Sequence, residues 1–249
     1  MEIRIANSHK WEKKVHLDPL SYFGKNAREK LRSTINKIDS FQIQSTIKPV
    51  DAEFLDWFLP MYQTRILEKK NPKIFDIKEK TFINPSKQYF SLELYEDNLP
   101  LGATIFSISQ EGRNFSIAYR TYRKSWLSAK LSANPSLYTE YLAGIAAVER
   151  NCELITHGRD RNPYGINSNI GLAAFKLMTG CQPKKSKKYG LELFDTTNIH
   201  VDSLVLEYPA EPSMLEIKKA YLLTTEENEH KWEAVKKYPD RLLVETLYR

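Results

Sequence analysis

The stretch "YFSLELYEDNLPLGATIFSISQEGRNFSIAYRTYRK", residues 89–124, predicts the centre of the fold. Apolar and polar residues alternate along it in three runs, which is typical of half-buried strands. Two turn signals separate the runs, one at Asp97–Asn98 and one at Glu111–Gly112. We therefore predict an antiparallel meander of three strands in the middle of the chain.

Helices and further strands flank this meander and predict a mixed α/β fold. The segment 51–70 opens with an acidic cap and reads as a helix that Pro60 kinks. The segment 135–151 is a helix that buries one face. In chain order from residue 41, the pattern predicts a strand (41–48), a helix (51–70), the meander, a helix (135–151), a strand (152–158), a helix (169–180) and a strand (187–196).

The two ends of the chain add smaller elements to this body. Residues 1–50 carry an N-terminal strand and a basic amphipathic helix at 26–39, and we expect them to be part of the main body. The segment 201–249 contains strands around one charged helix, and a Pro-containing stretch at 207–215 is the candidate junction with the main body. We expect this segment to be a small C-terminal strand-helix-strand appendage.

Composition limits the classes of function. Of 249 residues, 41% are hydrophobic, enough for a substantial core, and no run approaches the roughly 18 apolar residues of a membrane span. Cys152 and Cys181 lack a partner at ligand spacing, so we expect no metal site, no disulfide and a cytoplasmic setting. The net charge of +6 favours an anionic partner such as RNA, a nucleotide or a phosphorylated sugar, or it is only a lysine-rich surface.

Five of the nine glycines lie between residues 158 and 190. Glycine permits a positive φ and a close approach of another group, so the cluster is typical of a loop that wraps a ligand. The alternative is that these glycines only mark turns and the ends of helices and strands.

The order of elements resembles the GNAT N-acyltransferase fold, and the glycine-rich region resembles its FemAB-like branch. That branch has a strand ending in glycine, a loop, and a helix with the pattern G-x-x-x-F-K-x-x-x-G. The matching residues are Gly158, Arg159, Gly171, Phe175, Lys176 and Gly180. The resemblance covers about residues 20–200 and implies a GNAT-like acyltransferase domain over 41–200 with a central mixed sheet and flanking helices.

The chain departs from GNAT proteins that use acetyl-CoA in one respect. Those enzymes carry a glycine-rich turn that holds the CoA pyrophosphate with backbone N–H groups, whereas residues 120–137 contain no glycine. FemAB-like relatives that use aminoacyl-tRNA also lack this turn. The resemblance therefore implies no tightly bound cofactor and an acyl donor that is aminoacyl-tRNA or acyl-CoA.

Three residues are candidates for catalysis under this resemblance. Lys176 is expected to stabilise the oxyanion, and a solvated helix lysine is its alternative. Arg159 is expected to hold a carboxylate or phosphate and Asp160 to accept the amine proton, although the two are equally consistent with an ordinary ion pair at a strand end. His157 is a rival base, and a structural histidine is its alternative.

The candidates for substrate binding lie in two regions. Tyr164 and Asn167 belong to the loop that follows the strand, where a plain turn is the alternative. Aromatic residues and cations interleave along 119–126, which suits bases and phosphates, although half-buried strand aromatics have the same pattern. The residues assigned to substrate binding are Tyr164, Asn167, Tyr138, Tyr119, Arg120 and Arg123.

These observations predict an N-acyltransferase that joins an acyl or aminoacyl group to an amine. Its expected partners are a small-molecule or peptide amine acceptor and tRNA, with no integral membrane segment. A non-catalytic GNAT-shaped module that binds RNA or a nucleotide is the alternative from another class. A third reading keeps catalysis and uses acetyl-CoA with a non-standard cradle.

Overall fold

The computed structural model describes residues 2–6, 8–68, 74–78, 87–109, 113–123, 135–161, 170–185, 192–195, 197, 201–209, 211, 214 and 216–249, with the side chains of 159–161, 192 and 194 excepted. The chain forms two compact units. One comprises residues 14–155, and the other comprises residues 1–13 with 156–249. The domain boundaries expected from the sequence stay a prediction.

The described helices and strands form a mixed α/β fold, as the sequence predicts. The largest sheet has the strand order β3-β4-β5-β6-β7-β2-β8, and smaller sheets have the orders β1-β9 and β10-β11-β12. The elements are β1 (Glu2–Ile5), β2 (Ser8–Lys14), η1 (Pro19–Tyr22), α1 (Lys25–Ser40), β3 (Gln44–Pro49), α2 (Ala52–Leu67), β4 (Lys87–Glu96), β5 (Leu99–Ser109), β6 (Asn114–Tyr122), α5 (Pro135–Glu149), β7 (Leu154–Arg161), α6 (Ile170–Met178), β8 (Gln182–Lys185), β9 (Glu192–Asp195), β10 (Ser203–Glu207), β11 (Lys219–Thr224), η3 (Glu229–Trp232), α7 (Glu233–Lys236) and β12 (Leu243–Tyr248).

The predicted meander is β4-β5-β6, and each of its strands pairs antiparallel with the next. The expected turn at Asp97–Asn98 is confirmed, because both residues have positive φ values, 49° and 65°. Positive φ at both central residues matches the right-handed twist of the flanking strands. The second expected turn, at Glu111–Gly112, lies outside the described residues.

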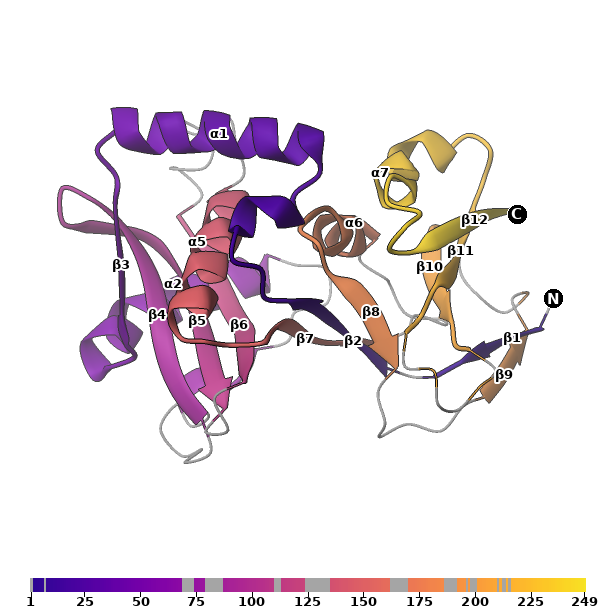
Figure 1. The fold of residues 1–249 in the computed structure, drawn as a ribbon, viewed down its shortest axis with the longest axis horizontal. Helices are drawn as coiled ribbons and strands as arrows, with labels where there is room; N and C mark the ends of the chain where they lie inside the picture. Colours follow the sequence, from indigo (N-terminus) through magenta and orange to yellow (C-terminus); the bar gives the residue numbers. More distant parts are fainter. Residues whose placement is uncertain are drawn as a thin grey trace. The chain divides into compact units, whose positions relative to one another are not determined.

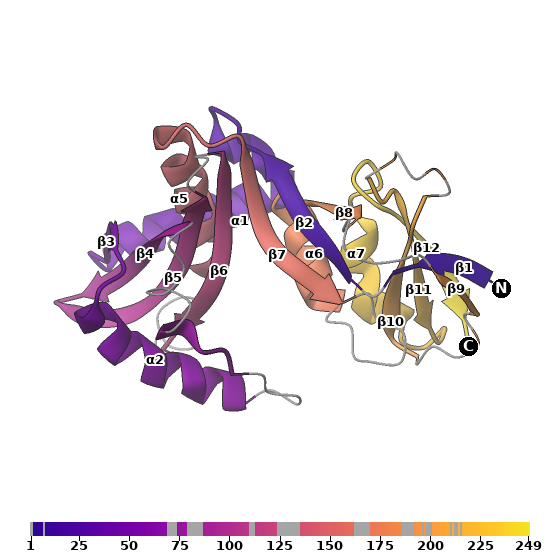
Figure 2. The ribbon, with the colours of Figure 1, turned by 90° about the horizontal axis from the view of Figure 1, so that it is seen from below.

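In the unit of residues 14–155, helices cover both faces of the sheet β3-β4-β5-β6 (Figure 1). Helix α2 lies on one face, whereas α1 and α5 lie together on the other (Figure 2). Strand alternation explains the two cores. Phe54, Phe58 and Ile105 are buried on the α2 face, and the opposite face carries a stack in which Phe106 lies 4.5 Å from Phe115 between ring centroids.

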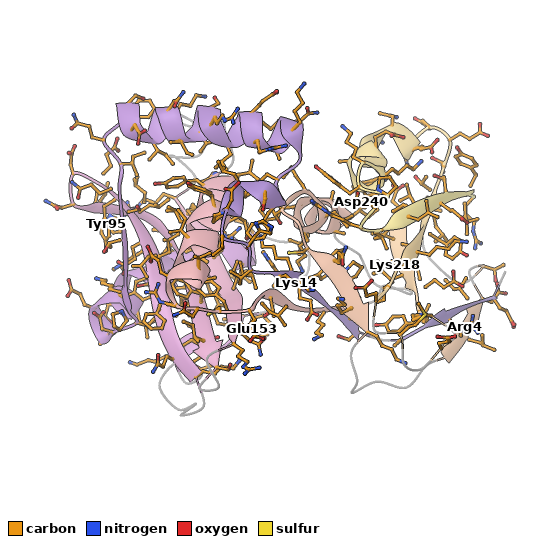
Figure 3. The ribbon with its side chains drawn as sticks, viewed as in Figure 1. Arg4, Lys14, Tyr95, Glu153, Lys218 and Asp240 are labelled. Carbon is orange, nitrogen blue, oxygen red and sulfur yellow. The ribbon has the colours of Figure 1, made fainter. Side chains whose placement is uncertain are left out.

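The α2 face of β4 also buries a carboxylate. Glu93 has no exposed surface, and Ser91 Oγ donates to its Oε1 at 2.5 Å while the Tyr95 hydroxyl (Figure 3) donates to its Oε2. The Lys48 ammonium lies 3.5 Å from Oε1 and neutralises the charge. Burial, together with the hydrogen bond to Glu93, raises the pKa of Tyr95 above its usual range. A buried carboxylate requires such partners, so this cluster fixes β3 against β4.

The other unit has a core built around Trp11 of β2, which has no exposed surface. The same core contains Leu177 of α6, Leu204 and Leu222 of the C-terminal sheet, and Val235 of α7. In that sheet β11 pairs antiparallel with β10 and parallel with β12. The predicted C-terminal strands and helix are therefore present. Strand β8, which pairs with β2, is missing from the sequence prediction because four residues give too short a pattern.

Gly102 of β5 provides a test of packing in the meander. A Cβ at this position would overlap the Tyr122 ring and lie 2.6 Å from the carbonyl oxygen of Thr121. The backbone atom cannot move without breaking the β5–β6 pairing, so we predict that Gly102→Ala lowers the free energy of unfolding by about 1–3 kcal/mol.

Urea unfolding measures this loss. Ala118→Ser, at an exposed position on the neighbouring strand β6, is the control, and we expect a change within about 0.5 kcal/mol. A Gly102→Ala protein as stable as the control would contradict this packing.

Candidate active site

Lys176 lies on α6 with its side chain buried, and only 3% of the residue is exposed. Its ammonium nitrogen is 5.5 Å from the centroid of the Trp11 ring. Indole is the strongest π partner for a cation, and the interaction gains strength where water is excluded. The alternative that Lys176 is a solvated helix lysine is therefore wrong.

The end of α6 gathers further cations. Lys13 is 6% exposed, and its ammonium donates to the carbonyl oxygen of Thr179 at 2.8 Å. Arg241 donates through Nη1 to the carbonyl oxygen of Leu177. The last carbonyls of a helix carry partial negative charge, so cations are favoured at this end. Helix α6 ends at Met178, and Gly180 follows it with a φ of 94°, which favours a residue without a side chain.

Trp11 itself has one polar group with no hydrogen-bond partner among the described residues. Its indole N–H is buried, and it forms no hydrogen bond with the residues that the structure describes. The ring of His9 packs edge-on against it at 5.5 Å between centroids. Two buried ammonium groups and a buried N–H donor on β2 and α6 form an environment that favours negative charge.

Sequence reasoning missed Trp11 and Lys13. The available signal was the period-two spacing of His9, Trp11 and Lys13 in β2, since residues at this spacing share one face of a strand. A lysine on the same strand face as a tryptophan and a histidine indicates that this face is buried and partly polar.

The other predicted catalytic residues cannot be placed as side chains. Arg159 and Asp160 belong to β7, and their side chains lie outside the described residues, as do Tyr164 and Asn167 entirely. Gly158 has a φ of 72°, and no other atom lies within 4 Å of where its Cβ would stand. Its positive φ favours glycine, and it lies inside β7, which continues to Arg161, whereas the sequence predicts that the strand ends at Gly158.

The predicted cations of β6 lie in the unit of residues 14–155, and Arg120 has a carboxylate partner there. Its Nη2 donates to Glu140 Oε1 at 2.7 Å, and its Nε donates to Thr104 Oγ1 at 3.2 Å. Glu140 is fully buried on α5. The hydroxyls of Tyr122 and Thr139 are 2.8 Å apart beside this pair. Polar contacts thus join β5 and β6 to α5.

The remaining predicted residues of this region lie apart from Arg120. Tyr119 is on the opposite face of β6, where its ring is 5.8 Å from that of Tyr62. The Arg123 Nε donates to the carbonyl oxygen of Pro100 at 2.7 Å, which fixes the end of β6. Tyr138 is half-buried against a cluster around Leu101 and packs there. Alternation along β6 therefore divides the interleaved aromatic and basic residues between two faces.

Glu140 is a third residue that sequence reasoning missed. It follows Leu137 by three positions and precedes Gly144 by four, so it lies on the buried face of α5. A carboxylate on an apolar helix face requires a buried cation, and this signal could have indicated the partner on β6.

Among the described residues, no group of three His, Cys, Asp or Glu side chains could hold a metal ion. No described helix has both the length and the apolar character that a membrane crossing needs.

The fold of this chain is similar to those of several solved structures. The structure of FemX superimposes with a TM-score of 0.54 at 14% sequence identity, over 74% of this chain and 61% of FemX. L-PGS from Bacillus licheniformis gives a TM-score of 0.45 at 14% identity, covering 70% of this chain and 53% of that one. A tandem GNAT protein from the clavulanic acid biosynthesis pathway gives 0.40 at 12% identity, covering 73% and 52%.

The chain therefore has a GNAT-like, FemAB-like fold, and it spans about three fifths of the length of FemX. No protein-family model matches the sequence, and no curated protein does.

The buried pair between Arg120 and Glu140 predicts a loss of stability. Glu140→Gln keeps the shape of the side chain but removes the carboxylate charge that pairs with the Arg120 guanidinium, whose side chain is 18% exposed. We expect the free energy of unfolding to fall by about 3 kcal/mol, since removing one partner of a buried ion pair leaves an uncompensated charge.

Glu153→Gln is the matched control, measured by the same urea unfolding. Glu153 (Figure 3) pairs with Arg113 at 3.6 Å, and both side chains are more than half exposed. An exposed pair of this kind contributes little, so we expect a change within about 0.5 kcal/mol. Equal losses in the two variants would show that the Glu140 pair is as well solvated as the surface pair.

Proposed function

We propose that the protein is an N-acyltransferase, which transfers an acyl or aminoacyl group from an activated donor to an amine. The donor is aminoacyl-tRNA or acyl-CoA, and the acceptor is a small molecule or a peptide. The observation that carries this proposal is the buried ammonium of Lys176 against Trp11, on the helix that follows β7 in a GNAT-like fold.

In the proposed reaction, the acceptor nitrogen attacks the carbonyl carbon of the ester or thioester. The C–N bond forms, and the carbonyl oxygen becomes an oxyanion. Collapse of the tetrahedral intermediate breaks the C–O or C–S bond and expels the alkoxide or thiolate, while the nitrogen loses its proton. Lys176 stabilises the oxyanion, and its burial supports this role because a charge interaction is strongest where water is excluded.

The other assignments are parts of the same proposal. Asp160 accepts the amine proton, with His157 as the rival base, and Arg159 holds a carboxylate or phosphate of a substrate. Tyr164 and Asn167 contact the acceptor. The glycine-free segment 120–137 supports aminoacyl-tRNA over acyl-CoA as the donor. Cys152 and Cys181 are buried and form no disulfide in the part of the chain that the structure describes, which supports a cytoplasmic setting.

The alternative of a non-catalytic module that binds RNA through β6 loses support from the structure. Arg120 pairs with Glu140, and the Arg123 guanidinium donates to a backbone carbonyl. A phosphate would have to compete with both partners for these cations.

Lys176 gives the test of the proposed function. Lys176→Met removes the charge and keeps an unbranched side chain that fits against an indole ring, so the fold is preserved. We expect kcat/KM to fall by about 10²-fold or more, the scale seen when one group that stabilises an oxyanion is lost. Lys176→Arg should restore it only in part, because a planar guanidinium places its charge differently from an ammonium.

The assay presents a panel of aminoacyl-tRNAs and acyl-CoAs with a panel of amines and detects the amide product by mass spectrometry. Lys87→Met, at an exposed position on β4, is the control and should keep wild-type activity. A folded Lys176→Met protein with kcat/KM within a factor of about two of wild type would contradict the role of Lys176. A wild-type protein that forms no amide from any pair would contradict the function itself.

A further inference from the structure

Helix α1 presents a row of cations on its outer surface. The helix runs along one side of the unit of residues 14–155, with α5 beneath it (Figure 1). Lys25, Arg28 and Arg32 are exposed, and their spacing of three and four positions places them in one row along the helix. We call these three residues the α1 stripe. At a rise of about 1.5 Å per residue, the stripe is about 10 Å long.

Positive charge is concentrated on this helix. Its 16 residues contain two carboxylates, Glu29 and Asp39, and five cations, which are Lys25, Arg28, Lys30, Arg32 and Lys37. The resulting charge of +3 is half of the net charge of +6 of the whole chain. Glu29 is the nearest acidic residue to the stripe in the sequence. In the part of the chain that the structure describes, neither Glu29 nor any member of the stripe forms an ion pair.

The stripe weakens the helix that carries it. Lys25 and Arg28 lie in the first turn, which contains no acidic residue, and cations at this end oppose the helix dipole. Arg28 also has a like charge three positions before it and another four positions after it, and both spacings are destabilising. A surface that serves only solubility mixes the two signs of charge. The stripe therefore needs a compensating gain, which an anionic partner supplies.

The surroundings of the stripe favour a nucleic acid over a lipid surface. A helix that binds a membrane inserts its apolar face, whereas the apolar face of α1 is buried against its own unit at Ala27, Leu31 and Ile38. The exposed uncharged residues of the helix all have amide or hydroxyl groups, which bind phosphate and sugar oxygens, and they are Asn26, Ser33, Asn36 and Ser40. Guanidinium groups bind phosphate through paired N–H donors. We propose that the α1 stripe binds the phosphate backbone of an RNA.

The choice of RNA among polyanions rests on the proposed function, in which aminoacyl-tRNA is the favoured donor. Binding itself requires no acyl group, because deacylated tRNA has the same phosphate backbone. It also requires no Lys176, which is not part of the stripe. The surface can therefore be tested separately from catalysis.

Fluorescence anisotropy with labelled, deacylated total tRNA over a series of NaCl concentrations tests the surface. We expect the triple variant Lys25→Gln/Arg28→Gln/Arg32→Gln to bind about tenfold more weakly than wild type at low salt. The slope of log K against log salt concentration should fall by about two to three, because each lost phosphate contact lowers it by about one. Lys176→Met should bind tRNA like wild type.

The matched control removes three exposed cations elsewhere in the same unit. Lys14→Gln/Lys87→Gln/Arg113→Gln lowers the net charge by the same amount. Lys14 and Glu153, the partner of Arg113, lie well away from α1 (Figure 3). We expect this control to keep the wild-type salt slope and an affinity within about twofold of wild type, because salt screens distant charges. The α1 variant should unfold at the same or a higher urea concentration than wild type, because it loses no ion pair.

Three results would overturn the inference. They are a wild-type affinity and salt slope in the α1 variant, equal losses in the α1 variant and the control, and tighter binding of poly-L-glutamate or phosphatidylglycerol vesicles than of tRNA. If the triple variant is less stable than wild type, Arg28→Gln/Arg32→Gln gives the comparison. Amide formation from aminoacyl-tRNA with unchanged tRNA binding by the α1 variant would exclude the surface alone. Binding of tRNA through the stripe without amide formation by any substrate pair would exclude the proposed function alone.

Discussion

Trp11 is the residue on which the unit of residues 1–13 and 156–249 depends. Its ring is fully buried, with α6 and the strands β10 and β11 in the same core. Segments from both ends of the sequence meet there, so the N-terminal strand cannot be removed without opening the core. The ammonium of Lys176 over this ring is held by the packing of the core as well as by its own attraction to the indole.

A buried cation constrains its surroundings in a second way. Desolvating an ammonium group costs free energy, which a favourable polar environment must offset. The end of α6 shows this requirement, because Lys13 and Arg241 donate hydrogen bonds to backbone carbonyl oxygens there. In the unit of residues 14–155, buried carboxylates pair with the cations instead. Glu140 and Glu93 each accept hydrogen bonds from neighbouring side chains and pair with a cation.

Local patterns predicted the fold well where they were long or chemically distinctive. The alternation of residues 89–124 defined the meander, and Asp97–Asn98 defined its first turn because few residues adopt positive φ in succession. Periodicity also predicted the helix α5, but Tyr141, Ile145 and Val148 of the predicted buried face are only half-buried, and the buried positions include Glu140, Ala143 and Ala147. Contacts distant in sequence were not predictable in this way. Trp11 and Lys176 are 165 positions apart, and α6 has nine residues, too few to tell a buried lysine from a solvated one.

The candidate site was predicted less completely than the fold, for the same reason. The motif around Lys176 indicated the residue but not its burial. The mixture of aromatic and basic residues in β6 suggested one surface, whereas the two faces of the strand carry different contacts. The carboxylate that pairs with Arg120 lies on α5, and only its unusual position on an apolar helix face indicated it.

The central claim is that Lys176 is a buried ammonium held against Trp11. Its rate of modification by an amine-reactive reagent, read by mass spectrometry of the native protein, tests this most directly. Exposed Lys87 provides the reference rate. The account predicts that Lys176 reacts on the order of a hundredfold more slowly, because reaction requires local opening of α6, and that the difference disappears in denaturant. Equal rates for Lys176 and Lys87 in the native protein would contradict it.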